Sequence, residues 1–273
     1  MVKDNMKRLI TIVVLLLSIE VQAEILDSTQ FVAFYRYILQ TQDCEQQDVS
    51  DSLRLALLVG TRATECTTVL DFEQNATPSI EMTNVLLTHI PYVLTDMKNS
   101  EVIACEPLYP YRYETHESMA KVNWELTDDT LTIGSWLCSC AIGKLHGKQW
   151  TVWYSMEIPY SAGPWKLRGL PGLVVKATDE ENTHCFELFD IKEENRVINY
   201  IQQPEYQMLS RKKFMKLKKK LLNDSRYIED PIYYLEDQPE DLVELDYEGT
   251  LYYVANHMII PQKVHVYQPL ELE

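Results

Sequence analysis

Alternation of apolar and polar residues with a period of two runs through most of this chain and constrains its fold more than any other feature. Such alternation is typical of β-strands that bury one face. It occurs in residues 31–39, 53–59, 64–70, 102–105, 122–126, 131–141, 149–158, 173–177, 184–191 and 197–201. Residues 251–260 and 264–267 predict a further closing pair of strands, and Asp128 and Asp129 predict a short turn.

Ten or more strands with few helices between them predict a mainly β fold of the α+β class. A sheet of this size must protect its edges, which favours a large curved antiparallel sheet or a half-barrel. The chain has 273 residues, 46% of them hydrophobic, which is enough for one sizeable core.

One amphipathic helix is predicted, from the capping residue Ser210 to Asn223. Lysine and arginine fill most positions outside an apolar arc of about 160°, although Lys218 falls inside that arc. The basic face is either a solvated helix face or a surface that docks on anionic lipid head groups or an acidic partner. The arc itself consists of Phe214, Met215, Leu217, Leu221 and Leu222.

Residues 1–23 have the features of an export signal. An apolar run at 9–19 follows three basic residues and precedes a small-residue cleavage pattern at 21–23. The run is too short to span a bilayer, which needs about 20 residues. We therefore predict one domain over residues 24–273, exported to the periplasm or the outer-membrane periphery, with no transmembrane segment in the mature chain.

The composition carries 25 basic and 41 acidic residues, a net charge of −16. A chain this acidic is unsuited to general nucleic-acid binding, so no nucleic-acid partner is predicted.

Six cysteines follow the export signal. An even number in an oxidising compartment predicts disulfides, but six thiols allow 15 pairings and the sequence does not choose among them. The six are Cys44, Cys66, Cys105, Cys138, Cys140 and Cys185.

Cys138 and Cys140 lie two apart in a predicted strand and should share one face. A bond between them would be strained, so they are either structural thiols or a thiolate pair for a soft metal. No second ligand pair stands at zinc-ribbon spacing, so no metal site and no cofactor is predicted, and these two cysteines are only weak candidates.

All five tryptophans and six of the eight glycines lie between residues 124 and 172. This clustering marks a geometrically demanding centre. Within it, Gly169, Leu170, Pro171 and Gly172 predict a tight turn, with Pro171 fixing its own φ and Gly172 taking a positive φ.

Residues 153–159 and 163–175, the latter reading GPWKLRGLPGLVV, resemble the GLPGLI family of exported Bacteroidota proteins. Weaker agreement extends over the whole mature chain and is densest at 124–179. The resemblance implies an exported protein without a known activity. It also implies a distant likeness to lipoprotein-carrier proteins, whose curved antiparallel sheet holds an acyl chain.

Three hypotheses for function follow. The first is a binding or carrier module for an apolar or amphiphilic, lipid-like ligand, although the same tryptophans could simply form the core. The second is a structural or accessory protein that meets an outer-membrane partner. The residues predicted to bind the ligand are Trp136, Trp150, Trp153, Trp165, Lys166 and Arg168.

The third hypothesis is an enzyme with a polar site near the GLPGL turn. No nucleophile elbow, HExxH motif or phosphate loop is present, so no catalytic residue and no reaction is predicted. Lys166 and Arg168 would either hold the turn by pairing with Glu157 or Asp179, or bind an anionic head group. The polar site would comprise Lys166, Arg168, Glu157, Tyr154 and Asp179.

Overall fold

The computed structural model describes residues 24–42, 46, 48–74, 83–84, 91–108, 111–222, 243–247, 250–255, 258–260 and 269–272. The predicted export signal, Cys44 and the predicted strand at 264–267 lie outside these residues. Within them, no helix is both long and apolar enough to cross a membrane.

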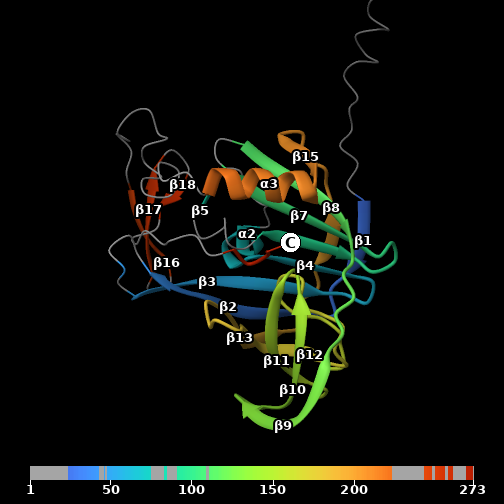
Figure 1. Cartoon of the computed structure of the whole chain (residues 1–273). Coiled ribbons are helices and arrows are strands. Elements are labelled where there is room, and N and C mark those ends of the chain that lie inside the picture. Colours follow the sequence, from blue (N-terminus) through green and yellow to red (C-terminus); the bar gives the residue numbers. More distant parts are fainter. Residues whose placement is uncertain are drawn as a thin grey trace, which may run out of the picture.

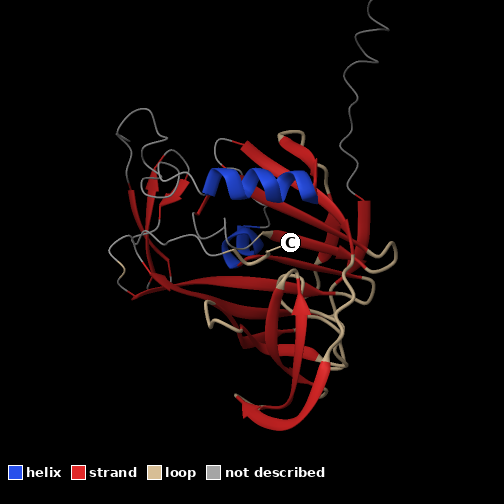
Figure 2. Ribbon diagram, in the orientation of Figure 1, coloured by secondary structure: helices blue, strands red, loops and turns tan. Residues whose placement is uncertain are grey.

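A twelve-stranded sheet dominates the described residues and confirms the predicted fold class (Figures 1 and 2). The sheet is open, with β15 and β9 at its two edges, and every neighbouring pair is antiparallel except β15 and β8. Its order is β15 (Tyr206–Ser210), β8 (Tyr111–Ser118), β7 (Glu101–Leu108), β6 (Tyr92–Asp96), β4 (Ala63–Thr68), β3 (Asp48–Val59), β2 (Phe31–Gln42), β13 (His184–Lys192), β12 (Leu173–Asp179), β11 (Lys148–Ser155), β10 (Trp136–Leu145) and β9 (Glu125–Ile133).

Two smaller sheets accompany the large one. In the first, β1 (Glu24–Ser28) pairs with β14 (Val197–Tyr200). The second has the order β16 (Val243–Tyr247), β17 (Thr250–Ala255), β18 (Met258–Ile260) and β5 (Thr83–Asn84). The predicted strand at 251–260 is therefore a hairpin formed by β17 and β18.

The large sheet buries both of its faces. Successive residues of a strand point to opposite faces, and in the central strands apolar side chains point to both. On β2, Ala33, Tyr35 and Tyr37 point to the face that we call the first, where the main core lies. Val32 and Phe34 point to the opposite, second face, which carries a smaller core. Segment 159–172, helix α3 and residues 269–272 cover the first face, while α2 and β14 cover the second.

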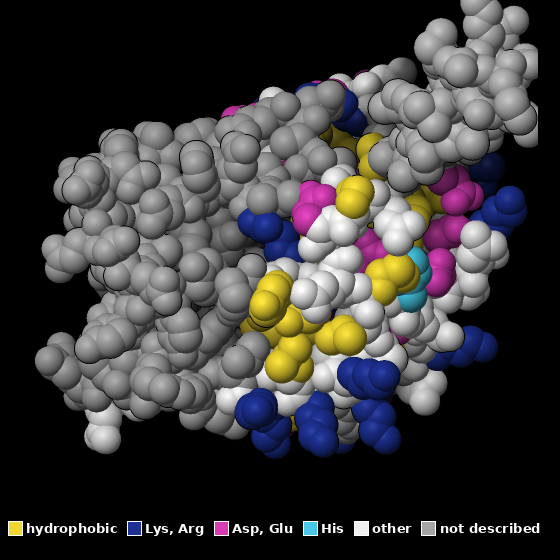
Figure 3. Space-filling model, turned by 90° about the horizontal axis from the view of Figure 1, so that it is seen from above, with side chains coloured by type: hydrophobic (Ala, Val, Ile, Leu, Met, Phe, Trp, Pro, Cys, Tyr) yellow, Lys and Arg dark blue, Asp and Glu magenta, His cyan; other side chains and the backbone are white. Residues whose placement is uncertain are grey.

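Helix α3 (Arg211–Leu222) confirms the predicted amphipathic helix. Phe214 packs against Tyr113 at a ring distance of 5.6 Å. Lys218 lies within the apolar arc because its ammonium group pairs with the buried Glu106. The remaining lysines of the helix, Lys212, Lys213, Lys216, Lys219 and Lys220, are exposed. Figure 3, which views the molecule from above, shows a row of lysine and arginine side chains along one edge of the described surface.

Helix α2 (Val69–Gln74) was not predicted, and it ends the strand expected at 64–70 two residues early. Thr68 caps the helix: its hydroxyl accepts the N–H of Asp71 at 3.0 Å and donates to the Asp71 carboxylate at 2.6 Å. Val69 and Phe72 then pack into the core of the second face.

The turn predicted at Asp128 and Asp129 is wrong, because both residues lie inside β9. The chain instead reverses at Gly134 and Ser135, where Gly134 has φ +59°. Strand β9 is an edge strand in which every residue is at least partly exposed, so aspartate is tolerated there. The expected single strand at 131–141 is therefore the tip of the β9–β10 hairpin.

The expectation for Gly172 is also corrected. Gly169 is the glycine of this segment with a left-handed backbone, at φ +92°, and Gly172 is not in that region. Gly172 is required for a different reason: a Cβ atom there would lie 2.1 Å from the carbonyl oxygen of Ser155.

The disulfide framework expected from the cysteine count is not found among the described cysteines, all five of which are free thiols. Each occupies its own environment: the Cys66 thiol accepts the N–H of Trp165, and that of Cys105 faces Glu114. Burial raises the pKa of Cys66 to about 12 and that of Cys138 to about 11, so these thiols are protonated at neutral pH. Cys138 and Cys140 are both buried in β10.

Candidate functional site

A pocket of about 530 Å³ lies between the second face of the sheet, helix α2 and residues 195–206, which lead through β14 to β15. Its apolar lining includes Leu58, Phe72 and Ile103. Its polar lining comprises Glu65, Thr67, Asp71, Tyr92, Cys105, Glu114, Asn195, Arg196, Asn199, Tyr200, Gln203 and Tyr206. We call this cavity the strap pocket, because residues 195–206 cross over the sheet to close it.

Strand register explains the arrangement of its floor. Tyr92 pairs with Cys105 across β6 and β7, and Cys105 pairs with Glu114 across β7 and β8. In the next row, Ile103 pairs with His116. Residues two apart on a strand share a face, so all five of these side chains belong to the second face.

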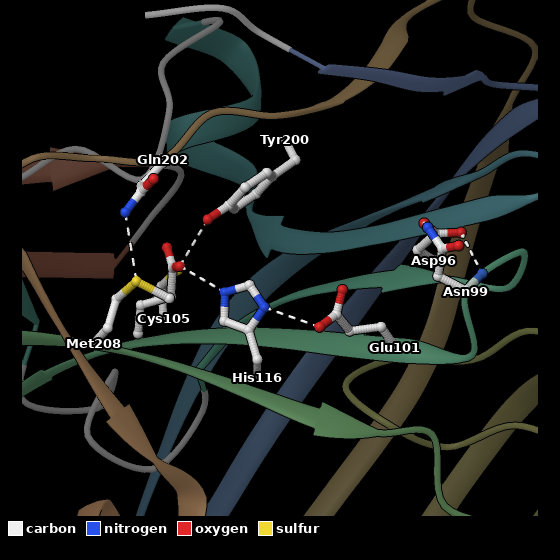
Figure 4. Close-up of polar contacts among 9 residues, drawn as sticks. Asp96, Asn99, Glu101, Cys105, His116, Tyr200, Gln202 and Met208 are labelled. Carbon is white, nitrogen blue, oxygen red and sulfur yellow. Dashed lines mark hydrogen bonds and ion pairs between the residues drawn. The ribbon is translucent and has the colours of Figure 1, made fainter.

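Glu114 is the centre of a polar network in the pocket lining, and Figure 4 labels its neighbours His116, Glu101 and Tyr200. One carboxylate oxygen accepts the hydroxyl of Tyr200 at 2.8 Å and lies 2.7 Å from Nε2 of His116. The Nδ1 atom of His116 lies 3.0 Å from Glu101.

This network shifts the pKa values of its members in opposite directions. Burial alone would raise the pKa of Glu114, but hydrogen bonds from His116 and Tyr200 outweigh it and hold that pKa below its usual value. The same contact with Glu114, together with Glu101, raises the pKa of His116. Glu114 is therefore ionised at neutral pH, and His116 is stabilised as a cation.

Glu65 supplies a second carboxylate, from β4. Burial raises its pKa to about 7, the charge of Asp71 adds to that rise, and a hydrogen bond from Tyr92 opposes it. Glu65 therefore exchanges its proton near neutral pH. A carboxyl group with this property in a cleft is a mark of functional sites.

Among the described residues of the pocket lining, Arg196 is the one basic residue, and its charge is already engaged. Its guanidinium lies 2.7 Å from Glu194 and 4.6 Å from the ring centre of Phe72. The carboxylates of the lining therefore dominate its potential.

A second polar cluster lies on the first face, below the GLPGL segment. Lys166 contacts Glu117 and lies 2.6 Å from Glu271. Arg211 lies 3.0 Å from Glu117, contacts Glu271 and lies 3.1 Å from Nδ1 of His146. We call these five residues the ion cluster; it joins β8, segment 159–172, α3 and residues 269–272.

The members of the ion cluster are largely buried, and they strongly influence one another's pKa values. Burial alone would raise the pKa of Glu271, but Lys166 and Arg211 lower it to about 2. Burial also lowers the pKa of His146 to about 4, so this imidazole is neutral at pH 7. Two cations and two carboxylates compensate each other, which is typical of a structural charge network.

The six residues predicted to bind a ligand lie on the first face or at its margin, and none of them lines the strap pocket. Trp150 and Trp165 are buried in the main core with ring centres 5.6 Å apart. Trp136 and Trp153 are partly buried against the same core. Lys166 is buried in the ion cluster, while burial lowers the pKa of the partly exposed Arg168. A ligand-binding role for these residues remains a prediction.

The polar site predicted around the turn is divided. Lys166 pairs with Glu117 and Glu271, not with Glu157 or Asp179 as expected. Asp179 forms a separate buried pair with Lys148 at 2.7 Å and accepts the N–H of His184. Tyr154 is buried, and Glu157 is exposed. In the described part of the chain, no group of three histidine, cysteine or acidic residues could hold a metal ion.

The neutral His146 predicts a loss of stability in mild acid. Its pKa is near 4 when folded and near 6.5 when unfolded, so the unfolded chain takes up a proton that the folded chain does not. Stability should fall as the pH drops from about 6.5 to about 4. His146 has φ +47°, which asparagine tolerates, so we expect His146→Asn to lose less stability than the wild type between pH 7 and pH 4.5 in urea unfolding.

His116 provides the opposite control, because its folded pKa is raised. Its contribution grows as the pH falls, so His116→Asn should lose more stability than the wild type over the same range. Equal pH dependence in all three proteins would contradict both assignments.

Sequence similarity to a known family covers only a short part of the chain. A family model described as a protein of unknown function (Porph_ging) matches residues 143–176, from β10 through the GLPGL segment into β12. This match lies within the region where the GLPGLI resemblance is densest, and it supports similarity to a Bacteroidota-associated family of unknown function. No curated protein sequence matches the chain.

Solved structures show distant likeness. Two crystal structures of PNGF-II, in space groups P21 and C2, align with TM-scores of 0.44 and 0.43 at 15% identity, over 71% of this chain. The alignment covers 34% and 33% of those chains, so this chain spans about a third of their length. A LolA superfamily protein from Nitrosomonas europaea, NE2245, aligns with a TM-score of 0.26 at 8% identity, over 62% of this chain and 87% of the other.

The strap pocket was missed by reasoning from the sequence. Its floor comes from β3, β4, β6, β7 and β8, and its roof from residues 195–206, more than 80 positions after Glu114, so no local motif marks it. The nearest signal was the alternation of Glu65 and Thr67, and of Glu114 and His116, within strands. Polar side chains on one face of a strand are also typical of a face exposed to solvent, so this pattern does not predict a pocket.

Proposed function

We propose that this chain is an exported binding protein that holds a small amphiphilic ligand in the strap pocket. The carrying observation is the pocket itself, a cavity of about 530 Å³ with apolar and polar residues in its lining. Small-molecule sites typically have volumes of roughly 300 to 1,000 Å³ and contain converging polar groups. The volume of the strap pocket falls in this range.

Three features support binding in this place. Leu58, Phe72 and Ile103 offer an apolar surface to the body of a ligand. Glu65 and Glu114 offer hydrogen-bond acceptors to its polar end. Residues 195–206 form a roof that reaches the large sheet only at Tyr206, so a ligand would be contacted both by the sheet and by this separate segment.

The export part of this proposal is supported by the signal-like residues 1–23 and by the resemblance to exported proteins. A periplasmic or envelope location would place the pocket where small amphiphilic compounds cross between the membranes.

Filling the pocket tests the proposal. We expect the neutral fluorescent probe N-phenyl-1-naphthylamine to bind the wild-type protein saturably, with one site per chain. Asn199→Trp should lower its affinity at least tenfold, because Asn199 lines the pocket from the partly exposed roof and an indole there would occupy the cavity.

Leu126→Trp is the matched control, since Leu126 is 59% exposed on the edge strand β9 and lies outside the pocket lining. It should bind the probe as the wild type does. Thermal unfolding of all three proteins shows whether each is folded. Absence of saturable binding, or equal binding by folded Asn199→Trp, would overturn the proposal.

A further inference from the structure

We infer that the strap pocket selects ligands whose polar head is an ammonium group, a conclusion that rests on the proposed binding function. The candidate class is a primary amine with a compact apolar body. Three features of the pocket carry the inference: its carboxylates, its tyrosine rings and the engagement of its arginine.

The carboxylates come from three different elements. Glu65 belongs to β4, Asp71 to α2 and Glu114 to β8, and all three line the cavity. A carboxylate can accept about four hydrogen bonds, so a bound ammonium group can share Glu65 with Tyr92. An anionic head would meet like charge from all three elements, whereas a cation would meet complementary charge.

Tyr92, which lines the pocket, is influenced by the negative charges around it. Burial raises the pKa of its phenol well above the usual value, and the charges of Glu65 and Glu114 raise it further. In the sheet, Tyr92 pairs with Cys105, and Cys105 pairs with Glu114 on the next strand. A group placed beside Tyr92 is favoured when its charge is positive.

Tyrosine rings provide the second feature. Tyr92, Tyr200 and Tyr206 line the same cavity, and each ring presents a face of negative potential. Aromatic faces together with carboxylates are the usual means by which proteins recognise organic cations. The ring of Tyr200 is fixed in place, because its hydroxyl donates to Glu114 and its edge meets His116 at a ring distance of 5.9 Å.

The positively charged side chains in and beside the pocket, Arg196 and His116, already have acidic partners and therefore do not favour an anionic ligand. Arg196 pairs with Glu194 and stacks over Phe72, so an anionic ligand would have to compete with an existing partner. His116 is held between Glu101 and Glu114 and is compensated by them.

Three probes with one apolar body test the inference: 3-phenylpropylamine, 3-phenylpropan-1-ol and 3-phenylpropanoate. Isothermal titration at pH 8 should show the amine binding at least tenfold tighter than the alcohol, and the carboxylate binding weakest. Equal affinity for amine and alcohol, with both lost in Asn199→Trp, would overturn the ammonium inference and leave the binding function standing. No binding by any of the three would count against both.

A conservative variant identifies the carboxylate responsible. Glu65→Gln should weaken amine binding about fivefold or more and leave alcohol binding unchanged, because only the charge is removed. Glu125→Gln, on the exposed face of β9, is the matched control and should bind like the wild type. Unchanged amine affinity in folded Glu65→Gln would contradict the assignment.

The pH dependence gives an independent readout. Because the carboxyl group of Glu65 loses its proton near pH 7, amine affinity should rise between pH 6 and pH 8, and binding at pH 7 should release protons to the buffer. His116 can also titrate in this range, so the rise must disappear in Glu65→Gln if Glu65 causes it. The other ionisable groups that face the cavity are Asp71, Tyr92, Cys105, Glu114, Arg196, Tyr200 and Tyr206.

Discussion

Lys166→Met is expected to lower the free energy of unfolding by about 3 to 5 kcal/mol, the usual effect of removing one partner from a buried ion pair. The Lys166 side chain is 5% exposed and contacts two carboxylates that are themselves nearly buried, Glu117 and Glu271. Methionine keeps most of the length but leaves these carboxylates with Arg211 as their remaining partner in the ion cluster. Guanidinium unfolding at pH 7 measures the loss.

Lys144→Met is the matched control, because Lys144 is exposed on β10. Its effect should stay within about 0.5 kcal/mol, as for surface substitutions in general. The double variant Lys166→Met with Glu271→Gln should be less destabilised than the sum of the two single variants, since one neutral site then replaces an unpaired charge. Additive losses would show that Lys166 and Glu271 do not interact, contrary to their 2.6 Å contact.

Gly172→Val is expected to destabilise the fold more than Gly147→Val does. A Cβ atom at Gly172 would lie 2.1 Å from the carbonyl oxygen of Ser155, and backbone cannot move aside as a side chain can. At Gly147 the backbone has φ +87°, so valine there is strained by about 1 to 3 kcal/mol. We expect a loss of more than about 4 kcal/mol at Gly172, at the upper end of single substitutions.

Thermal and guanidinium unfolding of both variants test this order. Gly172→Ala is the milder companion, because it introduces the same clash with the smallest side chain and keeps the comparison measurable if the valine variant does not fold. Gly172→Ala with wild-type stability would show that the segment at 169–172 adjusts, and that the close approach to Ser155 is not required.

The strands and the amphipathic helix could be predicted because their signal is local. Period-two alternation marks β13 and residues 35–40 of β2, where buried and more exposed side chains follow each other in turn. The position of the β9–β10 hairpin was predicted wrongly because β9 is an exposed edge strand and neither of its faces must be apolar. Asp128 and Asp129 therefore resemble a turn in the sequence although they lie within the strand. Helix α2 was missed because it has six residues, fewer than two full turns.

The site required contacts that no local pattern specifies. Lys166 was expected to pair with nearby Glu157 or Asp179, yet its partners lie 49 positions before it and 105 after it, at Glu117 and Glu271. The sequence indicated that residue 172 must be glycine, but for a positive φ that the structure does not have. The actual reason, the close approach of the Ser155 carbonyl group, could not be predicted from the sequence. The strap pocket likewise depends on residues 195–206 crossing strands that occur much earlier.

The ion cluster also sets an order of events during synthesis. Its members are contributed at positions 117, 146, 166, 211 and 271, so the last carboxylate emerges from the ribosome after all its partners. Until then, the members already synthesised include two cations, Lys166 and Arg211, and one carboxylate, Glu117. The first face of the sheet is thus completed only when Leu270 and Glu271 arrive, so the main core cannot close until the final residues of the chain have been synthesised.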